Sequence, residues 1–346
     1  MHLYPLKFKP RFFDKIWGGR RLETSLNKEI PENELIGESW EIYDFPPGIV
    51  KGSTDWASAE IANGPLAGRT LHWAIQEFGK SLMGDVQLTG EHGQFPLLIK
   101  FLDAREDLSL QVHPNAEYAR THPGAHLKSE AWYVIENDPG TAIYKGLTKG
   151  ATNKSFADAI ADGTVMEQVV RIPVKPGDCH YLESGTVHAL GAGVFVAEVQ
   201  TPSDTTYRVF DFNRIEAATG KPRQLHVEQA LECIDFTGQS SKPQVRSHVS
   251  HPFTTVTRLV TCPYFKMDKV RFKEGFENRV PYDEPVIWIM LDGHAEVKID
   301  GMKEPISFTK GETLLLPAEM KNPILKTNSD CVWLEVTFPT KKSWEE

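Results

Sequence analysis

Short runs of β-branched and aromatic residues dominate the pattern of apolar and polar positions along this chain. Before residue 240 these runs predict β-strands, because they are short and rich in residues that favour an extended backbone. They are Ser39–Tyr43, Phe95–Phe101, Ala131–Ile135, Gly193–Val199 and Thr206–Phe210. Apolar residues spaced three to four apart predict helices over Thr70–Phe78, Asn153–Ile160 and Val227–Ile234. Asn153 and Ser155 suit the start of the second helix, and a further short helix is expected after Pro114.

The pattern changes at Gly238–Pro243, a polar stretch rich in turn residues that we interpret as a linker. The chain has 346 residues, which is long for a single core, so two domains are expected: 1–240 and 241–346. Strands are predicted after the linker at Phe253–Leu259, Tyr264–Arg271, Val286–Leu291, Ala295–Ile299, Thr313–Leu316 and Cys331–Phe338. Turns such as Asp292-Gly293 between them are typical of a sandwich or a jelly-roll barrel.

The two halves share a weak internal repeat. Gly177-Asp178 precedes His188 at the spacing at which Gly311-Glu312 precedes Asn322. The second copy therefore has an asparagine where the first has a histidine. We interpret the second half as a repetition of the first barrel without its metal.

Polar side chains within the first half form a candidate metal site. Gln111 and His113 are two residues apart, so they share one face of a strand, and Glu130 and His188 can join them by folding. Such a set of imidazole, carboxylate and amide groups suits a borderline divalent ion, and zinc is the best candidate. An amide oxygen is a weaker zinc ligand, which leaves a hydrogen bond to a ligand as the alternative for Gln111. His180 is expected to be exposed or structural.

Composition narrows the function classes. The formal charge of −9 argues against a nucleic-acid surface, and no apolar run reaches the length of a membrane span. The four cysteines have no CxxC spacing, so neither a zinc knuckle nor a disulfide framework is indicated. The N-terminus lacks a signal-peptide core, and we expect a cytoplasmic protein.

Several motifs together resemble the type I phosphomannose isomerases (mannose-6-phosphate isomerases), in their short bacterial form, within the cupin superfamily. Their order and spacing along nearly the whole chain carry the resemblance. They are Trp17-Gly18-Gly19, Gly37-Glu38-Ser39-Trp40-Glu41, Pro96–Lys100, Leu108–Pro114, Lys128–Tyr133, Ser184–Leu190 and Ser203–Val209. One departure is Glu183, where the family usually has proline before the turn that leads to His188.

The resemblance implies a mainly β fold of two cupin-like jelly-roll barrels, with a few helices inserted in or flanking the first. It implies a zinc-dependent aldose-ketose isomerase that interconverts mannose 6-phosphate and fructose 6-phosphate through a cis-enediol. One Zn²⁺ per chain would be held at Gln111, His113, Glu130 and His188. The catalytic arginine would be Arg208, with Glu198 a candidate acid or base. A family lysine that faces the substrate falls on Lys128.

The residues themselves support cationic roles near the metal. Arg208 lies on an apolar strand, where a guanidinium needs an anion such as a phosphate or a developing oxyanion. The alternative is a structural ion pair with Asp204 or Asp211. Lys128 is two residues from Glu130, so we expect it on the metal-facing side.

Ser109 and Lys100 are further candidates for substrate binding, and Ser109 shares its face with Gln111 and His113. Which cation holds phosphate stays open. Another metal-dependent cupin enzyme and a non-catalytic sugar-binding protein with two cupin barrels are the alternatives to the isomerase. The expected partner is a small sugar phosphate, with no nucleic acid or membrane, and the protein could be a monomer or a homodimer.

Overall fold

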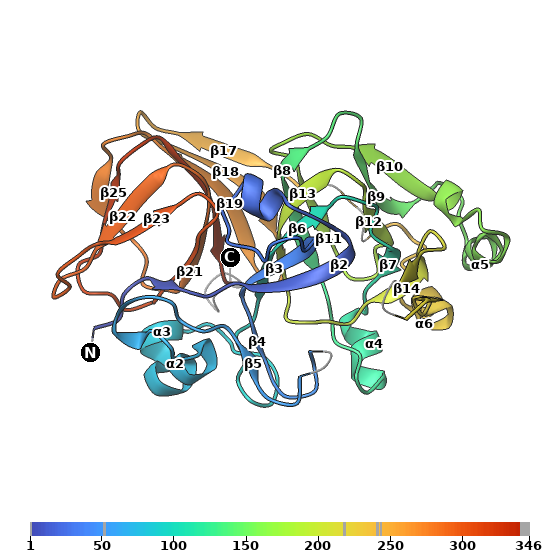
Figure 1. The fold of residues 1–346 in the computed structure, drawn as a ribbon, viewed down its shortest axis with the longest axis horizontal. Coiled ribbons are helices and arrows are strands. Elements are labelled where there is room, and N and C mark those ends of the chain that lie inside the picture. Colours follow the sequence, from blue (N-terminus) through green and yellow to red (C-terminus); the bar gives the residue numbers. More distant parts are fainter. Residues whose placement is uncertain (1, 51–52, 217–218, 240–241, 243, 340–346) are drawn as a thin grey trace.

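A computed structural model describes residues 2–50, 53–216, 219–239, 242 and 244–339, and it is mainly β (Figure 1). The first half contributes two antiparallel sheets. The six-stranded sheet has the order β11 (Cys179–Leu182), β8 (Glu130–Asn137), β13 (Val194–Gln200), β6 (Leu98–Ala104), β3 (Ile36–Ile42) and β2 (Arg11–Gly19). The five-stranded sheet has the order β10 (Val169–Pro173), β9 (Ala142–Leu147), β12 (His188–Leu190), β7 (Leu110–Val112) and β14 (Tyr207–Phe210).

The second half repeats this strand order. Its larger sheet has the order β1 (Leu6–Lys7), β24 (Thr313–Leu316), β21 (Val286–Asp292), β26 (Cys331–Thr337), β19 (Lys266–Phe272), β18 (Thr254–Thr261) and β17 (Ser247–Ser250). Its smaller sheet has the order β20 (Glu277–Arg279), β25 (Ile324–Thr327), β22 (His294–Lys298) and β23 (Ile306–Thr309). Apart from β1 and β14, each strand of these four sheets has a counterpart at the same place in the other half.

Shorter elements connect and flank the sheets. Two-residue ladders join β4 (Asp44–Phe45) to β5 (Ala57–Ser58) and β15 (Ile215–Glu216) to β16 (Lys221–Pro222). The α-helices are α1 (Arg21–Thr24), α2 (Leu71–Phe78), α3 (Lys80–Met83), α4 (Ala116–Thr121), α5 (Asn153–Asp162) and α6 (Val227–Cys233). The 3₁₀ helices are η1 (Gly64–Leu66) and η2 (Val165–Gln168). None of the helices in the described part of the chain is long and apolar enough to cross a membrane.

Every strand and helix predicted from the apolar pattern is present, with bounds that differ by at most three residues. The expected role of Ser155 at the start of α5 is confirmed, since its hydroxyl oxygen accepts from the Thr152 amide. The N-cap itself is Thr152, whose side chain accepts from the Ser155 amide, so the expectation for Asn153 is wrong. Part of the predicted linker, Ser240, Ser241 and Pro243, lies outside the described residues.

Alternation along the central strands separates two cores. On β6, Leu102 faces a core inside the first pair of sheets, whereas Phe101 faces a large core shared with the strands of the second half. On β13, Val196 and Ala197 divide in the same way. Because both faces are covered, these strands are buried throughout and carry nearly continuous apolar runs. Even-numbered positions in the middle of β6, β8 and β13, such as Leu102, Trp132 and Val196, therefore point between the two sheets of the first half.

Candidate active site

Three neighbouring strands of the six-stranded sheet place polar side chains on that inner face. Glu198 on β13 lies opposite Lys100 on β6 and opposite Trp132 on β8. Glu130 is two residues before Trp132, so it shares the face at the start of β8. The pairing of the strands thus brings together polar residues that lie far apart in the sequence.

The facing five-stranded sheet contributes a second row. His188 on β12 pairs with Gln111 on β7, and Gln111 pairs in turn with Arg208 on β14. His113 follows β7 directly, one position beyond its last residue. The residues predicted to bind metal and the predicted catalytic arginine therefore lie on adjacent strands.

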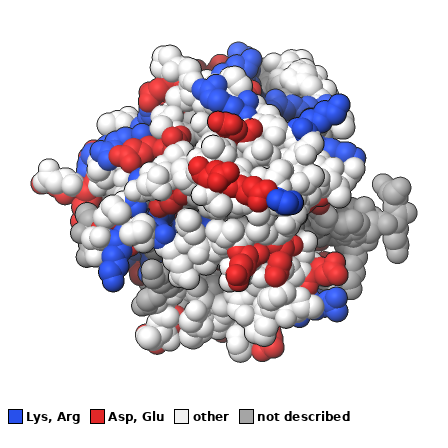
Figure 2. Space-filling view, turned by 90° about the vertical axis from the view of Figure 1, so that its right-hand side faces the viewer, with Lys and Arg blue, Asp and Glu red and all other residues white. Residues whose placement is uncertain are grey.

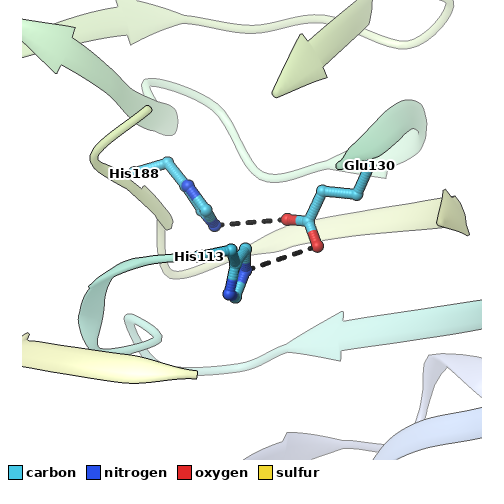
Figure 3. Close-up of side chains that lie close together, drawn as sticks. All are labelled: His113, Glu130 and His188. Atoms are coloured by element: carbon cyan, nitrogen blue, oxygen red, sulfur yellow. Dashed lines mark ion pairs between the residues drawn. The ribbon is translucent and has the colours of Figure 1, made fainter. Parts of the chain in front are cut away.

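The Glu130 carboxyl group faces both histidines from one side, as Figure 3 shows. Its Oε1 is 3.2 Å from His188 Nε2, and its Oε2 is 3.5 Å from His113 Nε2. One ligand atom from each of the three residues lies within 4.8 Å of the others, and all three side chains are buried. The described residues contain no other such group of three or more histidine, cysteine and carboxylate side chains.

Hydrogen bonds fix both imidazole rings with Nε2 turned to the carboxylate. His113 Nδ1 lies 3.0 Å from the Thr205 carbonyl oxygen, and His188 Nδ1 lies 2.8 Å from the Thr186 carbonyl oxygen. Since a carbonyl only accepts, the proton resides on each Nδ1 and a lone pair remains on each Nε2.

Those lone pairs face carboxylate oxygens that also have nothing to donate. His113 Nε2 and Glu130 Oε1 are buried without a hydrogen-bond partner among the described residues. Buried polar atoms of this kind are rare unless water or an ion satisfies them. The donor set of two neutral imidazoles and a carboxylate fits a zinc ion.

The charge states of the cluster agree with metal binding. Burial favours neutral forms, yet the Lys128 ammonium and His113 outweigh it and hold the pKa of Glu130 well below its ordinary value. Burial, and then the nearby Lys128, lowers the pKa of His113 to about 3. A deprotonated carboxylate and neutral imidazoles are the forms that bind a cation.

Gln111 lines the cavity and contacts His188 of the metal cluster. Its amide nitrogen lies 3.3 Å from His188 Nε2. The oxygen and nitrogen of an amide exchange places by a half-turn, so this arrangement is compatible with either role expected for Gln111, direct ligation or a hydrogen bond.

A cavity of about 1000 Å³ lies beside the cluster, and two of its lining residues, Gln111 and Lys128, contact His188 and Glu130. All the remaining predicted site residues line it: Lys100, Ser109, Gln111, Lys128, Glu198 and Arg208. Lys128 also contacts the metal cluster, since its Nζ lies 2.8 Å from Glu130 Oε2. It precedes β8 and is not part of the strand. The volume is ample for a hexose phosphate.

Glu198 is buried in the wall of this cavity. Trp132 Nε1 donates to its Oε2 at 2.7 Å, and Lys100 Nζ lies 3.4 Å from its Oε1. Burial and the nearby charge of Glu130 raise the pKa of Glu198, against the opposing effects of Lys100, Lys128 and Trp132. A buried carboxylate with a raised pKa has the properties of a general base.

Arg208 presents an uncommitted guanidinium. It forms no ion pair with any described residue, and its Nε is buried without a hydrogen-bond partner. Asp211, one of the two carboxylates considered as a structural partner, is instead held by Arg214 and Arg223. The structural-pair alternative is therefore wrong, and Arg208 is free to bind an anion.

The turn that carries His188 is rigid despite Glu183. Gly185 donates its amide to the His113 carbonyl and accepts from the Asp235 amide just beyond α6. Its φ of +88° favours glycine, and a Cβ there would lie 3.1 Å from the Cys233 carbonyl oxygen. Contacts on both sides of the turn thus replace the stiffness that proline supplies in the family.

The sequence did not single out two other parts of the site. Glu38 lines the cavity and forms ion pairs with Lys15 and Lys100, and Trp132 donates to Glu198. Both lie in the quoted motifs, at even-numbered positions that alternation places on the inner face. His180 lies outside the metal cluster, as expected.

Basic side chains slightly outnumber acidic ones in the cavity although the chain is acidic overall. Among the described residues its lining has six cations (Lys15, Lys100, Lys128, Arg208, Lys221 and Arg223) and five carboxylates (Asp14, Glu38, Glu198, Asp204 and Glu216), within a protein of formal charge −9. On the face shown in Figure 2, acidic and basic side chains are interspersed without one broad basic patch. A local excess of basic groups in an acidic protein suits a small anionic ligand.

Comparisons with known proteins agree with this geometry. The model of the type I phosphomannose isomerase catalytic domain matches residues 6–150. Mannose-6-phosphate isomerase ManA of Bacillus subtilis is 34% identical over 330 residues, which cover 95% of this chain and 98% of the relative. The crystal structure of the mannose 6-phosphate isomerase from Bacillus subtilis matches with a TM-score of 0.83 and 32% identity, covering 97% of this chain and all of that one. A zinc-bound mannose 6-phosphate isomerase shares the fold, with a TM-score of 0.69 and 15% identity over 97% of this chain and all of that one.

Proposed function

Because the chain belongs to the type I phosphomannose isomerases, we propose that it interconverts mannose 6-phosphate and fructose 6-phosphate through a cis-enediol intermediate. The observation that carries the proposal is the buried His113–Glu130–His188 cluster beside a cavity lined by Lys100, Lys128 and Arg208. An oxygenase does not need this set of lysines and arginine, and a non-catalytic sugar-binding protein does not need a poised buried carboxylate.

We propose that His113, Glu130 and His188 hold one zinc ion, with Gln111 beside them. When bound, zinc is a Lewis acid that stabilises negative charge on nearby oxygens. The two Nδ1 hydrogen bonds keep the Nε2 lone pairs in place for it. A zinc-bound relative of the same fold supports this choice of metal.

The reaction moves one proton between C2 and C1, and a second proton between the oxygens O2 and O1 on the same two carbons. Glu198 takes the carbon-bound proton and returns it to the neighbouring carbon, because its raised pKa brings its carboxylate towards the working range of a base. Trp132 and Lys100 orient the carboxyl group from either side.

Arg208 and Lys128 supply positive charge to the developing enediolate and to the phosphate. The free guanidinium of Arg208 has donors for two oxygens, whereas Lys128 is partly neutralised by Glu130. Lys100 and Ser109 are further candidates for substrate contacts from the cavity wall.

We also propose that each pair of sheets is a cupin-like jelly-roll barrel. The repeated strand order supports this, with 1–240 as the catalytic domain and 241–346 as a barrel without metal. Strand β1 is then the piece of the first domain that joins the sheet of the second.

Metal analysis and a coupled assay on mannose 6-phosphate test the proposal together. The purified protein should contain about one zinc per chain and form fructose 6-phosphate, and chelation should abolish turnover until zinc is restored. Glu198→Gln is the matched variant, since it should retain zinc and lose turnover. A zinc-loaded, folded protein without activity on mannose 6-phosphate would contradict the proposal.

A further inference from the structure

The second half of the molecule contains a cavity of its own, of about 430 Å³, between its two sheets. Residues of β19, β21 and β26 line it from one sheet, and residues of β20 and β25 line it from the other. The corresponding strands of the first half, β6, β8, β13 and β7, line the substrate cavity. The two cavities thus occupy equivalent places in the repeated architecture.

The register of the strands also preserves one polar pair. Trp288 on β21 lies opposite Glu335 on β26, as Trp132 on β8 lies opposite Glu198 on β13. In both halves the indole donates to the carboxyl group, at 3.0 Å from Trp288 Nε1 to Glu335 Oε2 and at 2.7 Å in the first half. The second half therefore retains this Trp–Glu pair, of which Trp288 lines the second cavity.

The groups that bind charge in the first half are replaced. In the same register, Val286 occupies the place of Glu130, and Asp268 occupies the place of Lys100. Asp268 is held in an ion pair by Arg258. The second cavity has thus lost both the central metal ligand and the buried lysine.

Aromatic rings form much of the wall of the second cavity. Phe272 stacks on Trp333 with ring centroids 4.8 Å apart, and it contacts Phe276 at 4.5 Å. Tyr282 covers Glu335 and donates to its Oε2 at 2.6 Å. Apolar walls with a few polar groups are typical of pockets for small molecules.

Polar groups lie where a ligand would project out of this aromatic pocket. Asn278 and Arg279 on β20 line it and are exposed. Arg279 forms no ion pair with any residue that the structure describes. Amide and guanidinium groups donate hydrogen bonds that suit hydroxyl oxygens. A sugar ring offers the matching surface, with one apolar face for the phenyl rings and hydroxyls around its edge.

We propose that this cavity is a second binding site, which takes an uncharged hexose against the rings of Phe272 and Phe276, with its hydroxyls directed to Asn278 and Arg279. The site shares its place in the fold with the substrate cavity but lacks counterparts of Glu130 and Arg208, since Val286 replaces the first and the second half has no described strand that corresponds to β14. Its occupation does not depend on the proposed isomerase reaction.

Isothermal titration calorimetry with D-mannose on the metal-loaded protein tests this site. We expect saturable binding with a dissociation constant of about 1 mM, the range that a ligand of this size reaches. Phe276→Ala should weaken it by about fivefold or more, because the exposed side of the ring is lost. Phe236→Ala, which removes a ring of the same size far along the chain, is the matched control and should leave binding unchanged.

Two further variants make the assignment of the site decisive. Arg208→Ala disables the substrate cavity and should retain D-mannose binding, while Arg279→Ala, at an exposed position, should weaken it. Turnover of mannose 6-phosphate should be unaffected in Phe276→Ala. Absence of saturable binding, or binding abolished by Arg208→Ala and unchanged by Phe276→Ala and Arg279→Ala, would overturn the proposal. Binding of mannose 6-phosphate in place of D-mannose at this site would overturn its uncharged character.

Discussion

The hydrogen bond from Trp132 to Glu198 makes a sharp prediction about the pH dependence of turnover. Trp132→Phe keeps an aromatic ring beside His188 but removes the N–H that stabilises the ionised carboxylate at 2.7 Å. Hydrogen bonds to charged groups contribute about 1.5–3 kcal/mol. Losing one therefore shifts the ionisation of Glu198 to higher pH by about one to two pH units.

The sign follows from the role of Glu198 as a base, which must be ionised. Burial has already raised the pKa of Glu198, and removing a donor that lowers it raises it further. The acidic limb of kcat/KM should therefore move up by about one to two pH units, while the alkaline side of the profile changes little. The assay is the coupled measurement on mannose 6-phosphate across the pH range.

Trp40→Phe is the matched control. Trp40 lines the same cavity and donates from its indole, at 2.8 Å, to Glu38 rather than to Glu198. Its acidic limb should stay near that of the wild-type protein. If the limb of Trp132→Phe also stays in place while turnover falls, then Glu198 is not the base whose ionisation controls the reaction.

Three other predictions concern the metal, the guanidinium and the turn. His113→Ala and His188→Ala should each lose the metal and the activity, and full zinc occupancy by elemental analysis would remove that residue from the ligand set. Arg208→Lys should keep the fold and zinc but lower kcat by about two orders of magnitude, the scale of a charge donor to the transition state. Steady-state kinetics would show an effect mainly on KM if Arg208 binds only phosphate, and near-wild-type values would exclude it from both roles. Gly185→Ala should lower the free energy of unfolding, measured in urea, by about 1–2 kcal/mol. The decrease should be larger than for the control Gly150→Ala, because Gly150 also has a positive φ but a Cβ there meets no atom. Equal decreases in the two variants would show that the Cys233 contact is unimportant.

Much of the candidate site could be predicted from local pattern. Alternation placed Gln111 and His113 on one face, and the structure brings that face to Glu130 and His188. The roles of Trp132 as a donor to Glu198 and of Asp211 as the partner of other arginines could not be predicted. Both depend on the register between strands that lie far apart in the sequence, which the spacing within one strand does not determine.

For the fold, too, some elements could be predicted from the local pattern and others could not. Long apolar runs such as those of β6 and β13 were predicted because burial on both faces leaves a strong signal in composition. Strands β17 and β20 are short and exposed, so nothing in their side chains distinguishes them from loops. The Thr152 cap was missed because Asn153 and Ser155 are equally suitable residues, and only backbone geometry decides among the three.

The pairing of β1 with β24 has a consequence for the order in which the chain folds. Leu6 lies opposite Leu315, and Lys7 Nζ lies 2.6 Å from Glu312 Oε1. Since a ribosome releases the N-terminus first, this first strand waits for almost the whole chain to be synthesised before its partner exists. Such a distant contact adds to the loop-closure cost and slows the final step of folding. We therefore expect β1 to pair with β24 only after the second half of the molecule has been synthesised and folded.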